Sequence, residues 1–207
     1  MMRSLALLLA VAVLPAFAQD PARVVKPEIR VGDSWTYRST NLLWPGTHEQ
    51  ELRVSFVDAR TLLVVSTTKG EGKEYDSSWT PEWNAVTAPS GLMFRPNSGL
   101  FRFPLRIGDK HEVNYELLRP RGNLPESATS GSSMVAGWET VEVPAGKFRA
   151  VRIELDTMVR SAEAPRAFPR RATFWYVPEV RRWVKFQVTT PKFTGIEELI
   201  EYKLNEN

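Results

Sequence analysis

Hydrophobic and polar residues alternate along much of the chain. Residues 151–156 (VRIELD) are the clearest case, and the same two-residue period recurs over 52–56, 113–117, 174–176 and 184–188. A period of two indicates a strand with one buried face. The continuous apolar run over 61–67 (TLLVVST) predicts a strand that is buried on both faces. No segment before residue 195 has a helical period, so we predict a mainly antiparallel β fold with few or no helices.

Short turns separate these predicted strands. Residues 58–60 (DAR) connect two of them as a tight hairpin, and Pro144 and Ala145 lie between the strands predicted over 138–143 and 148–159. Gly146 follows directly and suits a backbone conformation with positive φ. We therefore expect Pro144 and Gly146 to be structural turn residues.

A four-residue pattern occurs twice. Residues 30–33 (RVGD) and 106–109 (RIGD) each precede a predicted strand, and Gly32 and Gly108 are expected to shape the turns. The repeat suggests two similar β halves, although the remainder of the two halves does not match.

The sequence is compatible with more than one structure for two segments. Residues 119–133 (RPRGNLPESATSGSS) are expected to form a mobile loop, or a joint that subdivides the domain. Residues 196–204 fit a helix through positions 196, 199, 200, 203 and 204, and fit a strand through 200, 202 and 204. Their place after a series of strands favours the strand.

The first eighteen residues predict a secretory signal peptide. Arg3 precedes an apolar run over 5–14 (LALLLAVAVL), and Ala16 and Ala18 form a small-x-small cleavage signal. Cleavage after Ala18 would leave one exported β domain over 19–207, periplasmic or secreted. The apolar run is about ten residues, too short for a bilayer core of roughly 30 Å, and no transmembrane segment is expected after cleavage. With no cysteine, the chain is not expected to be a lipoprotein or to hold metal through thiolates.

Little in the sequence points to catalysis. The chain has two histidines, His48 and His111, no Gly-x-Ser-x-Gly motif and no His/Asp/Glu cluster with metal-ligand spacing. We predict no catalytic residue, no metal site and no cofactor. A glycosidase needs two carboxylates in one cleft, which a sequence alone does not show.

Aromatic residues give the strongest functional signal. The predicted ligand-binding residues are Trp79, Trp83, Trp175, Tyr176 and Trp183. In regular strands Trp175 faces away from Tyr176, and Trp183 faces away from Phe186. Core packing is one interpretation of these residues. The functional interpretation is an apolar groove for acyl chains, or flat platforms for sugar rings.

Basic residues concentrate in the last third of the chain. Residues 147–192 contain eleven Lys or Arg and four Asp or Glu, a local charge of +7, whereas the whole chain carries +3. This excess predicts peripheral contact with an anionic membrane or glycan surface. Nucleic acid is not expected as a partner in the periplasm.

Four further segments have a recognisable combination of residues. They are 103–109 (FPLRIGD), 137–148 (GWETVEVPAGKF), 173–181 (TFWYVPEVR) and 198–202 (ELIEY). Together they resemble exported bacterial β proteins of the TapB type, over roughly residues 30–204. The chain departs from that family at His111, where an aromatic residue is usual. The resemblance implies a periplasmic curved sheet or half-barrel, and it transfers no active site because the matching residues are architectural.

These observations predict a non-enzymatic envelope protein that binds an apolar or amphiphilic ligand, a lipid or a glycan, or takes part in envelope assembly. One alternative is a carbohydrate-active enzyme or accessory module with paired carboxylates beside Trp79, Trp83 or Trp175. A second alternative is a structural subunit packed against an envelope protein. If we know which face of the strand over residues 174–177 is exposed to solvent, we can tell whether the aromatic residues line a groove or fill a solid core.

Overall fold

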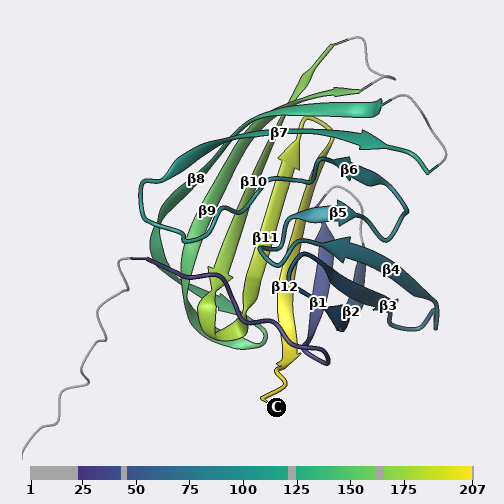
Figure 1. Cartoon of the computed structure of the whole chain (residues 1–207), viewed down its shortest axis with the longest axis vertical. Coiled ribbons are helices and arrows are strands. Elements are labelled where there is room, and N and C mark those ends of the chain that lie inside the picture. The colour runs from purple at the N-terminus through teal and green to yellow at the C-terminus, as the bar shows by residue number, and fades with distance from the viewer. Residues whose placement is uncertain (1–22, 43–45, 121–124, 162–165, 207) are drawn as a thin grey trace, which may run out of the picture.

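Twelve antiparallel strands form the described part of the chain (Figure 1). The computed structural model describes residues 23–42, 46–120, 125–161 and 166–206. The strands are β1 (Ser34–Asn41), β2 (Thr47–Val57), β3 (Leu62–Thr68), β4 (Glu74–Trp79), β5 (Ala85–Thr87), β6 (Met93–Arg95), β7 (Lys110–Leu118), β8 (Pro125–Val143), β9 (Gly146–Ser161), β10 (Phe168–Val177), β11 (Arg182–Thr190) and β12 (Phe193–Lys203). A 3-10 helix, η1 (Pro178–Val180), lies between β10 and β11. The signal peptide predicted over 1–18 lies outside the described residues.

The strands close into a barrel. Each strand pairs with its neighbours in sequence, and β12 also pairs with β1, from Ser34 opposite Lys203 to Asn41 opposite Gly195. The predicted antiparallel β class is confirmed, but the predicted curved sheet or half-barrel is wrong. Pairing of the first and last strands satisfies backbone groups that a half-barrel would leave at two open edges.

The two ends of the barrel differ. Because the strands run up and down in sequence order, connections after even-numbered strands lie at one end, here called the base, and those after odd-numbered strands at the other, called the mouth. The purple N-terminal segment crosses the base (Figure 1), where Val24 pairs with Leu105 through two 2.8 Å backbone hydrogen bonds. The C-terminus lies at the same end (Figure 1).

The repeated Arg-apolar-Gly-Asp pattern forms two turns of the same construction. Gly32 N donates to Val54 O at 2.9 Å, and Val54 N donates back to Asp33 O at 2.9 Å. Gly108 and Val135 repeat this exchange in the second turn, at 2.8 and 2.9 Å. Both glycines have positive φ, 92° and 87°. The pattern therefore marks the same local structure before β1 and before β7.

The prediction that the strand over 61–67 is buried on both faces is wrong. Leu62 and Val64 are buried, but Leu63 is 40% exposed, so the strand has one solvent face instead of two buried ones. On β2, the pairing with β3 shifts register between Val54 and Phe56, and Phe56 is exposed although it continues the apolar alternation. A bulge of this kind moves the following side chain to the opposite face.

The two segments with open assignments are largely strand. Residues 196–204 confirm the favoured alternative, because β12 includes them as far as Lys203. Residues 119–133 are not one loop, because β8 begins at Pro125. Residues 121–124 lie outside the described part of the chain.

Candidate functional site

An aromatic cluster fills the barrel at its base. Trp83 lies in the connection between β4 and β5, is fully buried, and meets Trp35, Trp79 and Trp183 with ring centroids 5.4–6.1 Å apart. The indole N–H groups of Trp35 and Trp83 donate to the backbone oxygens of Val180 and Arg181, at 2.9 and 2.8 Å. These bonds attach the cluster to the segment around η1, which begins directly after β10 ends at Val177.

Arg182 lies within this cluster and is 2% exposed. Its guanidinium carbon is 4.0 Å from the ring centroid of Trp83 and 3.9 Å from that of Trp183. Three more rings lie within 6 Å of it, and we name the five rings together the aromatic box: Trp35, Tyr37, Trp79, Trp83 and Trp183. Cation–π attraction to these rings offsets part of the cost of burying the charge.

A register shift explains why β11 directs Trp183 inward. Trp175 pairs with Lys185 and Tyr176 pairs with Trp183, so Val184 has no partner on β10. The extra residue places Trp183 beside the same internal cavity as Phe186. The prediction that these two side chains face opposite ways is therefore wrong, because it assumed a regular strand.

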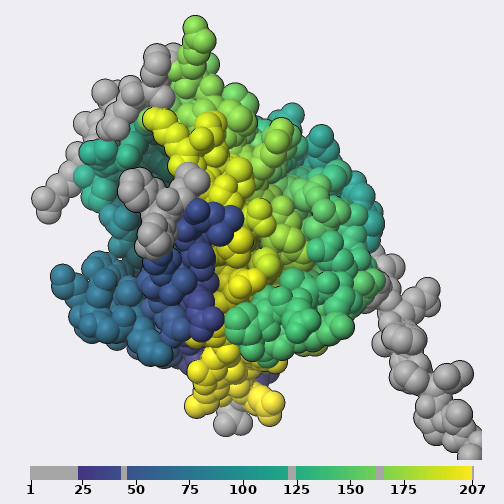
Figure 2. All heavy atoms as spheres, turned by 180° about the vertical axis from the view of Figure 1, so that it is seen from behind, coloured from purple at the N-terminus to yellow at the C-terminus, as the bar shows by residue number. Residues whose placement is uncertain are grey.

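Above the aromatic box the barrel contains a partly open cavity of about 250 Å³. It extends from Arg182 near the base to Phe94 and Arg170 toward the mouth. Its walls are mainly apolar, with Leu52, Leu100, Phe174 and Phe186 among them. Seen from behind, the molecule is hollowed between the blue N-terminal strands and the teal strands above them (Figure 2).

Several polar groups beside this cavity lack hydrogen-bond partners. Among the described residues, five buried side-chain atoms have none: Ser66 Oγ, Tyr176 Oη, Arg182 Nε, Arg182 Nη1 and Trp183 Nε1. All except the Tyr176 hydroxyl belong to residues that line the cavity. Because buried polar groups are rarely left unpaired, their concentration at one cavity calls for an explanation.

Glu197 supplies the cavity with a carboxylate. Burial raises its pKa above the ordinary value near 4.5, and the charges of Arg182 and His48 oppose that rise only in part. Burial also lowers the pKa of Arg182, which Glu197 and Tyr37 partly counteract. The cavity thus contains two groups of opposite charge, both held in an environment that disfavours charge.

Replacing Glu197 by glutamine is expected to stabilise the protein at neutral and alkaline pH. A carboxyl whose folded pKa is raised costs stability as pH rises through the interval between its unfolded and folded pKa values. Glutamine does not ionise, so the stability of the variant should exceed that of the wild type above this interval and match it near pH 4. Urea unfolding at pH 4 and pH 8 measures both differences. A wild type that is the more stable at pH 8 would contradict this explanation.

The predicted aromatic residues occupy four different environments. Trp79 and Trp183 line the cavity, and Trp83 lies in the aromatic box at the base. Tyr176 is buried in the core, and its ring packs against Phe103 with centroids 5.5 Å apart. Trp175 lies on the outer face, where its indole donates to Glu139 and Lys185 lies over its ring. The strand over 174–177 therefore directs Phe174 and Tyr176 inward and Trp175 outward.

The sequence does not single out the polar residues of the cavity. Arg182 belongs to the basic region over 147–192, and neither Ser66 nor Glu197 lies in a motif that predicts a site. A charged residue directly before Trp183, at the start of a strand, was the one available signal for Arg182. Convergence of β3, β11 and β12 on one cavity is a property of the closed barrel and has no local signature.

The basic region over 147–192 does not form one exposed stripe. Arg182 is inside the barrel, and Arg181 forms an ion pair with the buried Asp33 at 2.9 Å. Arg152 pairs with Glu139 and Glu154 on the outer surface. The local excess of positive charge is therefore divided between the interior, the base and the outer surface.

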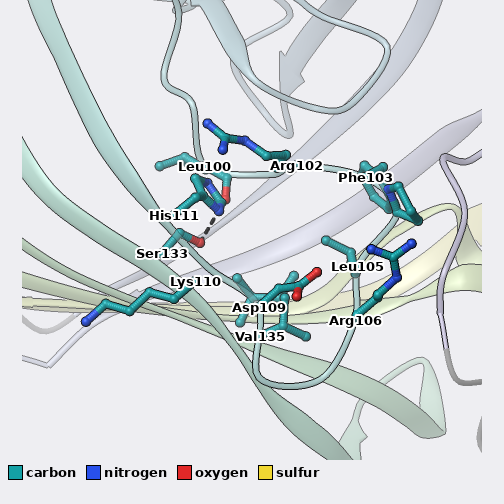
Figure 3. Close-up of a pocket in the computed structure, with 12 residues that line it drawn as sticks. Leu100, Arg102, Phe103, Leu105, Arg106, Asp109, Lys110, His111, Ser133 and Val135 are labelled. Carbon is teal, nitrogen blue, oxygen red and sulfur yellow. Dashed lines mark hydrogen bonds between the residues drawn. The ribbon is translucent and has the colours of Figure 1, made fainter.

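A second pocket of about 290 Å³ lies near the base (Figure 3). His111 and Ser133 line it, but His111 Nε2 is 3.0 Å from Gly99 O and Ser133 Oγ donates to Leu100 O at 2.9 Å. The Lys110 side chain points away from the pocket (Figure 3). His111 and Ser133 are thus engaged with the backbone, and no described residue of this pocket has a buried polar side-chain atom without a partner, which makes it a weaker candidate than the cavity inside the barrel.

No group of three or more His, Cys, Asp or Glu side chains in the described residues is arranged to hold a metal ion. No helix in the same residues has the length and hydropathy to cross a membrane.

Two solved structures share this fold. A lipoprotein candidate from Parabacteroides distasonis aligns with a TM-score of 0.57 and 13% identity, over 89% of this chain and 100% of that chain. A candidate exported protein with a YmcC-like fold from Bacteroides fragilis aligns with a TM-score of 0.56 and 15% identity, over 87% and 99% of the two chains. No protein-family model and no curated protein matches the chain significantly. Neither structure is described as TapB, and the chain is similar to both in its all-β fold.

Proposed function

We propose that this protein is an exported, non-enzymatic component of the cell envelope that binds an amphiphilic ligand inside its barrel. The observation that carries the proposal is the cavity of about 250 Å³, which has apolar walls and unpartnered polar groups at its base end. An amphiphile supplies both kinds of contact at once. The signal peptide predicted over 1–18, and the words used for the two structural neighbours, support an envelope location.

A hydrolase and a packed structural subunit fit this geometry less well. Glycoside hydrolysis needs two carboxyl groups across one cleft, roughly 5–10 Å apart. Among the described residues that line the cavity, Glu197 is the one carboxylate. A purely structural subunit would need no internal cavity. We therefore favour binding, with a lipid-like ligand in preference to a glycan because most of the wall is apolar.

Native mass spectrometry tests the proposal directly. Protein purified from the envelope of its own cells, without detergent, is expected to carry a bound mass that organic extraction removes. The extracted protein should then bind the neutral apolar dye 1-N-phenylnaphthylamine with increased dye fluorescence. An apo mass together with no dye binding would overturn the proposal.

Replacing Ser66 by leucine is expected to weaken dye binding about tenfold. Ser66 Oγ has no hydrogen-bond partner, so the change removes no bond and places extra carbon atoms in the cavity. Excess volume in a filled site costs about 1–3 kcal/mol, which corresponds to roughly a tenfold loss or more. Dye titration measures the effect.

Ser130→Leu is the matched control, because Ser130 is exposed on β8. This variant should bind the dye as the wild type does. Equal binding by Ser66→Leu and Ser130→Leu would place the dye outside the cavity.

A further inference from the structure

We propose that Arg182 selects ligands with an anionic, oxygen-rich head group on a single alkyl chain. The inference rests on the proposed function and specifies its ligand class. It follows from the kinds of polar atom that the cavity leaves unpaired, and from their position in a mainly apolar space whose other arginine, Arg170, donates to the Tyr115 hydroxyl at 2.9 Å.

The unpartnered groups are mainly donors. Arg182 Nε, Arg182 Nη1 and Trp183 Nε1 can only donate hydrogen bonds, and Ser66 Oγ can donate or accept. A ligand that satisfies them must supply acceptors. Carboxylate and phosphate oxygens are the acceptors that guanidinium groups bind most strongly, through charge-assisted hydrogen bonds.

The aromatic box holds Arg182 in place for this role. The rings of Trp83 and Trp183 lie about 4 Å from the guanidinium carbon. No ion pair joins Arg182 to a carboxylate among the described residues, and Glu197 acts on it electrostatically without a direct contact of that kind. The rings thus position the charge of Arg182, and its Nε and Nη1 atoms have no partner in the protein and are left for an incoming anion.

The remaining wall fits one hydrocarbon chain. From Arg182 the cavity continues along Phe174, Phe186 and Phe94 toward the mouth. Its volume of about 250 Å³ lies just under the roughly 300–1,000 Å³ of pockets for drug-sized ligands. This size favours a single-chain amphiphile over a two-chain phospholipid.

Four ligands with the same ten-carbon chain test the selectivity. Decanoate and decyl phosphate carry anionic head groups, decan-1-ol is neutral, and decyltrimethylammonium is cationic. Displacement of 1-N-phenylnaphthylamine from the extracted protein gives the affinity of each. We expect at least one of the two anions to bind roughly tenfold to a hundredfold more tightly than decan-1-ol, and the cation to bind most weakly. Comparison of the two anions shows whether a carboxylate or a phosphate is preferred.

Substitution locates the selectivity. Arg182→Met keeps an unbranched side chain and should reduce anion affinity to that of decan-1-ol. Lys185→Met removes a positive charge from the outer surface, where Lys185 pairs with Glu198 at 2.7 Å, and should leave the affinities unchanged. If Arg182→Met does not fold, Trp183→Phe removes one unpartnered donor while keeping a ring, and should weaken anion binding several-fold without affecting decan-1-ol.

The outcomes separate the two proposals. Equal affinities for the anions and decan-1-ol, or tightest binding of the cation, would overturn the role of Arg182 while the barrel remained a binding protein. The unpartnered donors would then be satisfied by water. Failure of all four ligands and of the dye to bind would overturn the proposed function itself.

Discussion

Replacing Trp83 by alanine is expected to lower the free energy of unfolding by about 3–5 kcal/mol, the usual cost of removing a large buried aromatic side chain. Trp83 is fully buried, contacts three other tryptophans, and donates its indole N–H to Arg181 O. Its loss also removes one of the two rings nearest the Arg182 guanidinium. Urea unfolding followed by circular dichroism measures the change.

Trp175→Ala is the matched control for this prediction. It deletes the same side chain from the outer face of β10, where Trp175 is only partly buried, and should cost about 1 kcal/mol. Similar losses in the two variants would mean that the aromatic box does not support the base of the barrel.

Replacing Asp33 by alanine is expected to cost about 3–5 kcal/mol, because it removes one partner of a buried charge network. The Asp33 carboxylate accepts hydrogen bonds from the Arg181 side chain at 2.9 and 3.0 Å, from Arg30 N at 3.0 Å and from Asn205 N at 2.7 Å. It thereby joins the turn before β1, the segment after η1 and the C-terminal residues. Thermal and urea unfolding both report the loss.

Asp109 provides the internal comparison, because it occupies the equivalent position in the second Arg-apolar-Gly-Asp turn. Its backbone makes the same exchange with β8, but its side chain is exposed. Asp109→Ala should therefore change the stability by about 0.5 kcal/mol or less. A large loss for Asp109→Ala and a small one for Asp33→Ala would contradict the assignment of the buried network to Asp33.

Local patterns predicted many of the strands but not the first part of β8, which lies within residues 119–133, and bulges account for two of the errors within the predicted strands. Val151, Ile153 and Leu155 are buried as their alternation requires, because β9 pairs with β10 without a register shift there. Phe56 and Trp183 lie next to register shifts, and their side chains lie on the face opposite to the one that a regular period assigns. Bulges depend on the partner strand, so a single strand sequence does not reveal them.

Closure of the barrel and the cavity depend on contacts between distant residues. Arg182 is one of eleven basic residues in its region, and only the position of its strand beside Trp35 and Trp83 makes it internal. Trp79 and Trp183 could be predicted as ligand-binding residues because an aromatic side chain is a candidate for ligand contact wherever it stands in the sequence. Ser66 has no distinguishing feature in the sequence, and its role follows from its burial without a partner.

The seam between β1 and β12 makes closure of the barrel depend on its last strand in sequence order. β12 lies about 160 residues after β1 in sequence. The pairing therefore joins residues that are very far apart along the chain, and it is expected to form late in folding. A chain that stops before Phe193 would present two unsatisfied strand borders, on β1 and on β11, each able to recruit another chain. Shortened translation products are therefore expected to be prone to self-association.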